Sequence, residues 1–276
     1  MAIEPGLGPG ALQGLPAPRI ASLVPSVTEL VVALGLARWL VARTGYCIHP
    51  AAAVAAIPKV GGTKTVNLVK LRRLMPTHVI VNRDENRRET VDALRAWPDP
   101  PTLIVTHPLD PQDNLALVEQ IVGAFAGIDG VVERGLALSA DLRRELDLTR
   151  PERRPSQQVL YLIWRDPWMT VARDTYLSRL LARVHWQTLP DRHGGDTGAA
   201  RYPVLDGREP WLAEVDEVLL SSEPYAFGPA DLAAAQALCP GARVQLVDGE
   251  LLSWYGPRAV PGLRYLRALA AETAAA

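Results

Sequence analysis

The chain has 276 residues, of which 48% are hydrophobic and 21% are charged, and its formal net charge is −1. This balance excludes a disordered chain, and the sequence shows no sustained basic stripe, so no nucleic-acid partner is predicted. The length suits one large domain or two smaller ones. The two cysteines, Cys47 and Cys239, are too few for a framework of disulfide bonds.

Residues 1–18 predict a flexible arm and not a secretory signal, because they hold four glycines and four prolines and lack a basic segment followed by an apolar one. No apolar run approaches the ~18 residues that span a bilayer, so no insertion into a membrane is predicted. We therefore expect a cytoplasmic protein, or a periplasmic one if the numbering begins after a removed leader.

The first ordered segment pairs a strand with a helix. Residues 20–24 form a short apolar run, and Ser26 with Glu29 three residues later has the pattern of a capping box. A strand that ends at Pro25 and a helix that begins at Ser26 are typical of an α/β unit. The same criteria predict a helix from Asn67 to Leu74, a strand over 78–82, a helix over 86–97 and a strand over 103–105.

Between residues 111 and 150 apolar side chains recur at intervals of three and four, which predicts one long helix. At 1.5 Å per residue this helix would be on the order of 50 Å long, enough to join two lobes. A basic stretch with prolines, residues 150–155, marks its end. The predicted parts are a flexible arm (1–18), an N-terminal α/β lobe (19–110), a bridging helix (111–150) and a C-terminal α/β lobe (151–276).

The second half repeats the order of elements found in the first. A short helix and the strand over 78–82 correspond to residues 211–215 and a strand over 218–222, and Val79 and Val218 lie 139 residues apart. The sequence therefore predicts two similar, Rossmann-like α/β lobes that are joined by one long helix. The default ligand site of such a protein is a cleft between the lobes.

Enzyme signatures are missing from the sequence, which contains no GxxxxGK[ST], GxSxG or HExxH motif. No catalytic residue and no catalytic cofactor is therefore predicted. An enzyme with Cys47 as nucleophile beside His49 is an alternative, but no third group is seen to orient the pair. The same two residues face one way in an extended segment and are predicted as ligands of a metal such as zinc, which would need two more ligands.

Aromatic residues near the ends of predicted strands make the stronger case for a binding site. Trp164 and Trp168 follow one such strand, and Trp254 follows another. Loops at the carboxyl ends of strands line the binding crevice of α/β sheets, and Trp and Tyr there suit a large, flat, partly apolar ligand. Arg165 or Arg258 would meet a carboxylate or phosphate of that ligand. The predicted ligand-binding residues are Tyr46, His49, Gly62, Lys64, Asn82, Trp164, Arg165, Trp168, Trp254, Tyr255 and Arg258.

Several sequence stretches carry a resemblance to a known family. Arg-Ile-Ala-Ser-Leu-Val-Pro-Ser-Val-Thr-Glu-Leu (19–30), Ala-Leu-Gly-Leu (33–36), Ile-Pro-Lys-Val-Gly-Gly (57–62) and Pro-Thr-His-Val-Ile-Val-Asn (76–82) closely resemble the helical-backbone substrate-binding proteins of ABC importers. These receptors take up cobalamin and ferric siderophores. Residues 46–50, 164–170 and 253–256 resemble a branch labelled as cobalamin-binding or metal-receptor proteins. The resemblance covers about residues 19–270 and implies two α/β lobes bridged by one long helix.

The resemblance also implies a function. It predicts a monomer that binds a metal chelate, a corrinoid or a ferric siderophore, between the lobes and delivers it to an ABC permease. The acidic residues that dock such receptors match about Arg88 and Ser253 here, with Glu85, Glu89 and Glu250 close by. The Asp and Arg of the cobalamin pocket match about Glu250 and Trp254. The alternative is a stand-alone cytoplasmic protein that binds a corrinoid, a haem or a metal without a permease.

Overall fold

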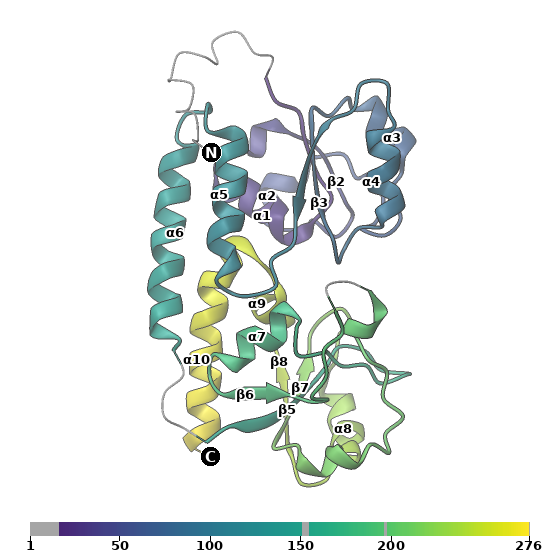
Figure 1. The fold of residues 1–276 in the computed structure, drawn as a ribbon, viewed down its shortest axis with the longest axis vertical. Helices are drawn as coiled ribbons and strands as arrows, with labels where there is room; N and C mark the ends of the chain where they lie inside the picture. Colours follow the sequence, from purple (N-terminus) through teal and green to yellow (C-terminus); the bar gives the residue numbers. More distant parts are fainter. Residues whose placement is uncertain (1–16, 151–154, 196–197, 276) are drawn as a thin grey trace, which may run out of the picture. The chain divides into compact units, whose positions relative to one another are not determined.

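The computed structural model describes residues 17–150, 155–195 and 198–275. The chain forms two compact units (Figure 1): unit 1 is Met1–Thr106 with Val118–Leu138, and unit 2 is His107–Leu117 with Ser139–Ala276. Each unit is built on a parallel sheet with helices, so the predicted class of two α/β lobes is confirmed. Residues 1–16 of the predicted arm and 151–154 of the predicted boundary lie outside the described residues.

The sheet of unit 1 has the strand order β2-β1-β3-β4, and all of its pairs are parallel. Because a parallel sheet is covered on both faces, most residues of its strands are apolar. In Figure 1, α3 and α4 lie on one side of β3, and α1 lies on the other. The elements are β1 (Ile20–Ser22), α1 (Pro25–Ala33), β2 (Leu40–Arg43), α2 (Ala51–Val54), α3 (Leu68–Arg73), β3 (His78–Asn82), α4 (Arg88–Arg95) and β4 (Thr102–Thr106).

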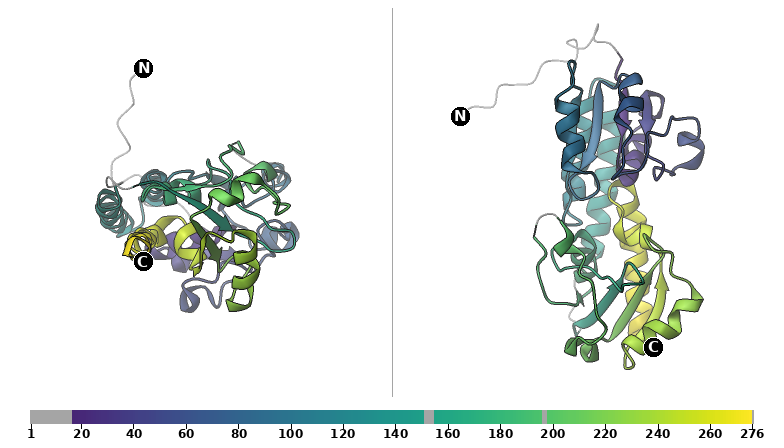
Figure 2. Two further views of the ribbon diagram at one scale, coloured as in Figure 1. Left: turned by 90° about the horizontal axis from the view of Figure 1, so that it is seen from below. Right: turned by 90° about the vertical axis from the view of Figure 1, so that its right-hand side faces the viewer.

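Unit 2 repeats this arrangement with the strand order β6-β5-β7-β8. Alternate residues of β5 face two separate cores: Val159 and Tyr161 pack with α7, α9 and α10, whereas Leu160 and Leu162 pack with α8. Figures 1 and 2 show α10 running along the first of these faces. The elements are β5 (Gln157–Leu162), α7 (Tyr176–Ala182), β6 (Trp186–Thr188), β7 (Glu217–Ser221), α8 (Leu232–Leu238), β8 (Arg243–Val247), α9 (Gly249–Ser253) and α10 (Ala259–Ala275).

The capping box predicted for the first helix is wrong. Helix α1 begins one residue earlier, at Pro25, and its N-cap is Val24, which offers no side-chain hydrogen bond. Proline is well suited to the first helical position because its φ is already helical and its missing N–H is not needed there. Ser26 therefore occupies the second helical position, where its side chain is buried and does not cap the helix.

The single helix predicted over 111–150 is also wrong. The structure has two helices, α5 (Asp113–Phe125) and α6 (Val131–Leu148). Between them the amide of Ile128 donates to the carbonyl of Phe125 (3.0 Å) and Gly130 has a φ of +76°. Gly130 directly precedes α6, and glycine adopts this left-handed, non-helical conformation at little cost. The apolar spacing continues through the break, so periodicity alone does not reveal it.

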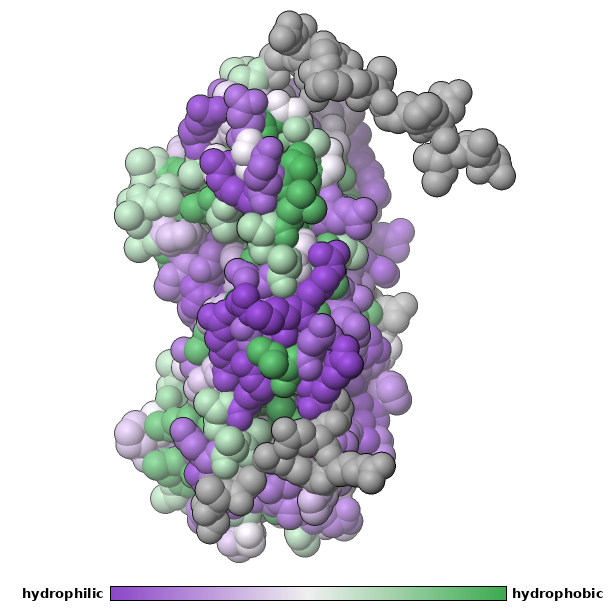
Figure 3. All heavy atoms as spheres, turned by 90° about the vertical axis from the view of Figure 1, so that its left-hand side faces the viewer, coloured by the Kyte–Doolittle hydropathy of each residue, from purple (hydrophilic) through white to green (hydrophobic). Residues whose placement is uncertain are grey.

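The surface on the side of α6 is mainly hydrophilic, and its hydrophobic side chains form small separate groups (Figure 3). Helix α6 exposes Val132 and Leu136. In the described part of the chain, no helix combines the length and the apolar character that crossing a membrane requires.

Candidate functional site

Each sheet has a position where its strand order reverses, because its second strand in chain order lies on one side of its first strand and the third lies on the other. In unit 1 it lies between β1 and β3, and in unit 2 between β5 and β7. Ligands of parallel α/β sheets bind at the carboxyl ends of the strands at such a position. The residues that follow these strands are therefore the candidates, and each unit is considered by itself.

In unit 2 four aromatic residues meet at this edge, and we call them the aromatic cluster: Trp164 and Trp168 after β5, and Tyr225 and Phe227 after β7. The Trp164 ring meets the edge of Tyr225 at 5.6 Å between centroids, and Trp168 stacks on Phe227 at 6.0 Å with an interplanar angle of 8°. The ring centroids of Tyr225 and Phe227 are 4.6 Å apart. Trp164 is 41% exposed, whereas Phe227 is only 7% exposed and belongs to the core. The cluster therefore exposes the Trp164 ring to solvent and is anchored in the core through Phe227.

Arg165 lies within this cluster and is held by two contacts. Its guanidinium lies 5.6 Å from the centroid of the Trp168 ring and forms an ion pair with Asp231. The amide of Gly228 donates to the same carboxylate (2.9 Å), and this bond together with Arg165 holds the pKa of Asp231 below its ordinary value. Arg165 thus braces Trp168 against the start of the helical segment at Asp231. The sequence predicts that Arg165 contacts a carboxylate of the ligand, but in the structure its guanidinium already pairs with the carboxylate of Asp231.

Trp254 lies inside unit 2 and not on its surface. It is 8% exposed, and its Nε1 donates to Oε1 of Glu223 (2.7 Å), which also accepts the hydroxyl of Ser253 (2.8 Å). The guanidinium of Arg258 lies 4.8 Å from the centroid of the Trp254 ring and pairs with Glu250 (2.6 Å). Trp254 and Arg258 were predicted to bind ligand, but their side chains contact each other and the carboxylates of Glu223 and Glu250 at the end of α9.

Tyr255 packs in the same region. Its ring meets Tyr176 edge-on at 4.9 Å, and both belong to the core under α7 and α10. The amide of the next residue, Gly256, donates to Oδ1 of Asn114 (2.6 Å), whose Nδ2 donates to the hydroxyl of Tyr176 (3.0 Å). The position of the Tyr255 ring is therefore explained by packing within the core of unit 2.

In unit 1 the exposed aromatic residue is Tyr46, which follows β2 and is 65% exposed. A Cβ atom added at Gly62 would lie 3.3 Å from the Tyr46 ring, so the ring rests on that glycine. The amide of Gly45 donates to the carbonyl of Gly61 (2.7 Å), and the ammonium of Lys64 donates to the carbonyl of Asp84. Tyr46, Gly62 and Lys64, all predicted to bind ligand, thus lie in two turns that are joined by this backbone hydrogen bond. Burial lowers the pKa of Lys64.

Asn82 was predicted to contact ligand, but it is 1% exposed. Its Oδ1 accepts the amides of Asp84 (2.8 Å) and Glu85 (3.3 Å), and its Nδ2 donates to Oγ1 of Thr106 (3.3 Å). These bonds account for the side chain. Asn82 therefore shapes the loop after β3 from within.

The Cys47–His49 pair lacks the surroundings of a metal site. Cys47 is fully buried, its Sγ lies 3.1 Å from Oγ1 of Thr44, and burial raises the pKa of its thiol. His49 is half-buried. Among the described residues, no three or more His, Cys, Asp or Glu side chains gather closely enough to hold a metal ion.

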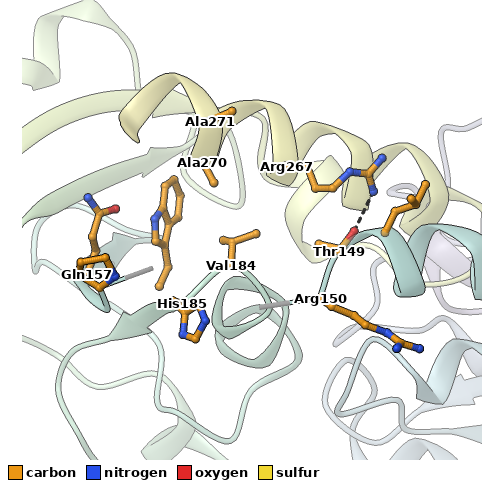
Figure 4. A pocket seen from close by; sticks show the side chains of 11 residues that line it. Thr149, Arg150, Gln157, Val184, His185, Arg267, Ala270 and Ala271 are labelled. Atoms are coloured by element: carbon orange, nitrogen blue, oxygen red, sulfur yellow. Dashed lines mark hydrogen bonds between the residues drawn. The ribbon is translucent and has the colours of Figure 1, made fainter. Parts of the chain in front are cut away.

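A hollow of about 490 Å³ lies elsewhere in unit 2, at the amino ends of β5 and β6 (Figure 4). Gln157 and Trp186, the first residues of these strands, are part of its lining. Arg267 donates to Oγ1 of Thr149 (2.8 Å), and Arg150 pairs with Asp147. The hollow is thus at the edge of the sheet opposite the aromatic cluster and its two arginines are already paired, so it is not the candidate site.

Glu223 gives a prediction on stability. Burial raises the pKa of its carboxyl, and the nearby Glu250 and Asp248 add to the effect. The folded chain therefore holds this proton more tightly than the unfolded chain does, so stability falls as the pH rises from about 4.3, the ordinary Glu value, through the raised pKa. Glu223→Gln keeps an acceptor for Trp254 and removes this dependence. Urea unfolding across that pH range is the measurement.

The exposed Glu214→Gln is the control, and it is expected to keep the pH dependence of the wild type. Equal dependence on pH in the wild type and Glu223→Gln would contradict the prediction.

Sequence reasoning missed Tyr225, Phe227, Glu223 and Asp231. A signal was present, because all four come shortly after the strand predicted over 218–222. The rule that selected Trp164, an aromatic residue after a strand, selects Tyr225 and Phe227 as well.

Known proteins resemble this chain in sequence and in fold. The family described as periplasmic binding protein matches residues 20–189 of the chain. A Bacillus subtilis (strain 168) protein described as an uncharacterized ABC transporter substrate-binding lipoprotein, YvrC, is 23% identical over 267 residues, which cover 90% of this chain and 78% of that protein.

Solved structures with a similar fold include the periplasmic vitamin B12 binding protein BtuF of Vibrio cholerae, with a TM-score of 0.76 and 20% identity over 94% of this chain and 98% of that one. The periplasmic heme-binding protein RhuT from Roseiflexus sp. RS-1 has a TM-score of 0.73 and 22% identity, covering 94% and 100%. The periplasmic heme-binding protein HutB of Vibrio cholerae has a TM-score of 0.71 and 21% identity, covering 92% and 99%.

Proposed function

We propose a ligand from one premise: the chain belongs to the periplasmic binding protein family, whose match spans residues 20–189. It is a substrate-binding protein of the ABC-importer type and not an enzyme. The ligand that we propose is a metal chelate with a large, flat ring system, a corrinoid or a haem. The observation that carries this proposal is the aromatic cluster of unit 2.

The chemistry of the cluster supports a ring ligand. Two indoles, a phenol and a phenyl ring lie together at the carboxyl ends of β5 and β7, and the Trp164 ring is exposed. Aromatic faces and edges bind other flat ring systems through burial of apolar area and offset or edge contacts. The ligands named for the Vibrio cholerae and Roseiflexus structures, vitamin B12 and heme, are of this kind and indicate which chelates to test.

The expectation of a cytoplasmic protein is wrong. The family is one of periplasmic binding proteins, and the Bacillus subtilis relative is described as a lipoprotein. The expectation rested on the composition of residues 1–18 and on the lack of an apolar run long enough to span a bilayer.

An ABC permease is the partner that we propose. Of the acidic residues near the positions that matched docking residues, Glu89 is exposed in the first turn of α4, whereas Glu250 is paired with Arg258. Glu89 is therefore the better candidate for a contact with a permease.

A tryptophan-fluorescence titration tests the ligand. Cobalamin, cobinamide, haemin and a ferric siderophore are added in parallel to the purified chain, and free N-acetyltryptophanamide corrects for absorption by the chelates. We expect a corrinoid or haemin to quench saturably at about micromolar affinity or tighter. Quenching by the siderophore alone would replace the ring ligand by a smaller iron chelate, and no quenching beyond the free-tryptophan control would contradict the proposal.

A further inference from the structure

The first turn of α1 leaves backbone donors without acceptors. The first amides of any helix have no partner within it and need a side chain, water or a ligand. The amide of Thr28 donates to the carbonyl of Val24 (2.9 Å), but Val24 offers no cap. In the part of the chain that the structure describes, the amides of Ser26 and Val27 have no hydrogen-bond acceptor.

Burial sets this helix end apart from others in the chain. The side chain of Asn67 caps α3, and that of Thr175 caps α7. Helix α4 has no side-chain cap either, but its first residues are exposed, so water reaches their amides. At α1 both Ser26 and Val27 are buried.

The hydroxyl of Ser26 is a second, independent sign of a missing partner. Ser26 is 3% exposed, and its Oγ is a buried atom without a hydrogen-bond partner. The neighbouring hydroxyls satisfy one another, since Thr28 donates to Ser22 (2.8 Å) or to the carbonyl of Val24 (2.8 Å). Because Cα–Cβ bonds in a helix tilt toward its N-terminus, the Ser26 side chain leans toward the same end as the two amides.

The surroundings of this helix end favour a negative charge. It lies at the carboxyl end of β1, and Pro25 at the start of the helix is only half-buried. Nδ2 of Asn86 donates to the carbonyls of Leu23 (3.2 Å) and Thr63 (3.0 Å), which places the turn that carries the exposed Lys64 beside it. Lys64 interacts with the carboxylates of Glu85 and Asp84, which offset part of its charge.

We propose that the first turn of α1 binds an oxyanion, a carboxylate or a phosphate group, through the amides of Ser26 and Val27 and the hydroxyl of Ser26. Helix N-termini suit such groups because their free N–H groups converge and the helix dipole is positive there. The inference goes beyond the proposed function, because it concerns unit 1 by itself and a free oxyanion as the ligand.

The test follows backbone amide shifts by nuclear magnetic resonance in the ¹⁵N-labelled full chain. Inorganic phosphate and acetate are titrated separately, with chloride at matched ionic strength. We expect saturable shifts of the Ser26 and Val27 amides with at least one oxyanion and none with chloride. The amide of Ser178, which already donates to Oγ1 of Thr175 (3.3 Å), is the control within the same spectra and is expected to stay still.

Two substitutions separate binding from folding. Ser26→Ala removes one hydrogen bond to a charged group and is expected to weaken oxyanion binding about tenfold. Ser26→Asp supplies a carboxylate from the chain itself, so we expect it to raise the melting temperature and abolish the shifts. Ser178→Ala, a buried serine in the first turn of a capped helix, is the matched control and is expected to keep oxyanion binding.

The results distinguish this inference from the proposed function. If oxyanions shift the two amides while no chelate quenches fluorescence, the anion site stands and the ligand proposal fails. If a chelate binds and no oxyanion moves these amides, water serves them and the anion site is wrong. Equal shifts with chloride would also overturn it.

Discussion

Replacing Trp164 or Trp168 by alanine is expected to weaken binding of the chelate by about 5- to 150-fold, which corresponds to the loss of about 1–3 kcal/mol for an aromatic anchor. Trp164 offers the exposed ring of the aromatic cluster, and Trp168 stacks on Phe227 beneath it. The measurement is a fluorescence or absorbance titration of each variant with the chelate that binds the wild type.

Trp211→Ala is the matched control. Trp211 is half-buried against the same core as Trp168, but it precedes β7 and so lies at the other end of that strand. It is expected to lower stability while leaving affinity unchanged. Full affinity in both Trp164→Ala and Trp168→Ala would mean that these rings serve packing alone.

Glu145→Ala is expected to lower the free energy of unfolding by about 3–4 kcal/mol, in the lower part of the range for breaking a buried ion pair. Glu145 of α6 is 3% exposed, and its two oxygens accept from Arg264 and Arg267 of α10, each at 2.8 Å. Arg267 also donates to Thr149 (2.8 Å). The loss stays below the maximum because the arginines keep part of their hydration, Arg264 being 50% exposed. Urea unfolding at neutral pH measures it.

Asp141→Ala on the same helix is the control, because the side chain of Asp141 is 48% exposed and pairs at the surface with Arg144 (3.0 Å). Such a pair contributes about 0–1 kcal/mol, so a similar loss in the two variants would contradict the prediction.

The pH dependence of this ion pair has the opposite sign to that of Glu223. Burial alone would raise the pKa of Glu145, but the hydrogen bonds from Arg264 and Arg267 outweigh it and the pKa is lowered. The stabilisation is therefore present above the ordinary pKa of Glu and is lost as the pH falls through the lowered value.

Much of the fold follows from local sequence patterns. The strand over 78–82 is predicted at its true bounds because a buried apolar run lies between turn signals, and Asn67 caps α3 as expected, its Oδ1 accepting the amide of Lys70 (2.8 Å). The strands Leu40–Arg43 and Trp186–Thr188 are missed because they have only four and three residues and neither leads directly into a helix as residues 20–24 do. Such short runs exist through pairing with a neighbour and not through a pattern of their own.

The candidate site can be predicted less completely from the sequence, because it depends on pairing between strands that are distant along the chain. Trp164 and Trp168 are found from their position after a strand. Their contacts with Tyr225 and Phe227 require that β5 pairs with β7, whose residues lie about sixty positions further along the chain. Asn82 shows the opposite case, since its place at a strand end suggests a ligand contact while the loop amides of Asp84 and Glu85 turn its side chain inward.

The division of the chain into units determines when each unit can complete its fold during synthesis. Unit 1 needs Val118–Leu138, which bring Phe125 to within 5.0 Å of the His78 ring and the guanidinium of Arg134 to the carbonyl of Leu34 (3.3 Å). A ribosome makes His107–Leu117, which belong to unit 2, before these residues. Unit 1 therefore cannot complete its core until Leu138 has emerged, and unit 2 waits for α10 at the very end. No single cut divides the chain into the two whole units, because His107–Leu117 of unit 2 precede Val118–Leu138 of unit 1.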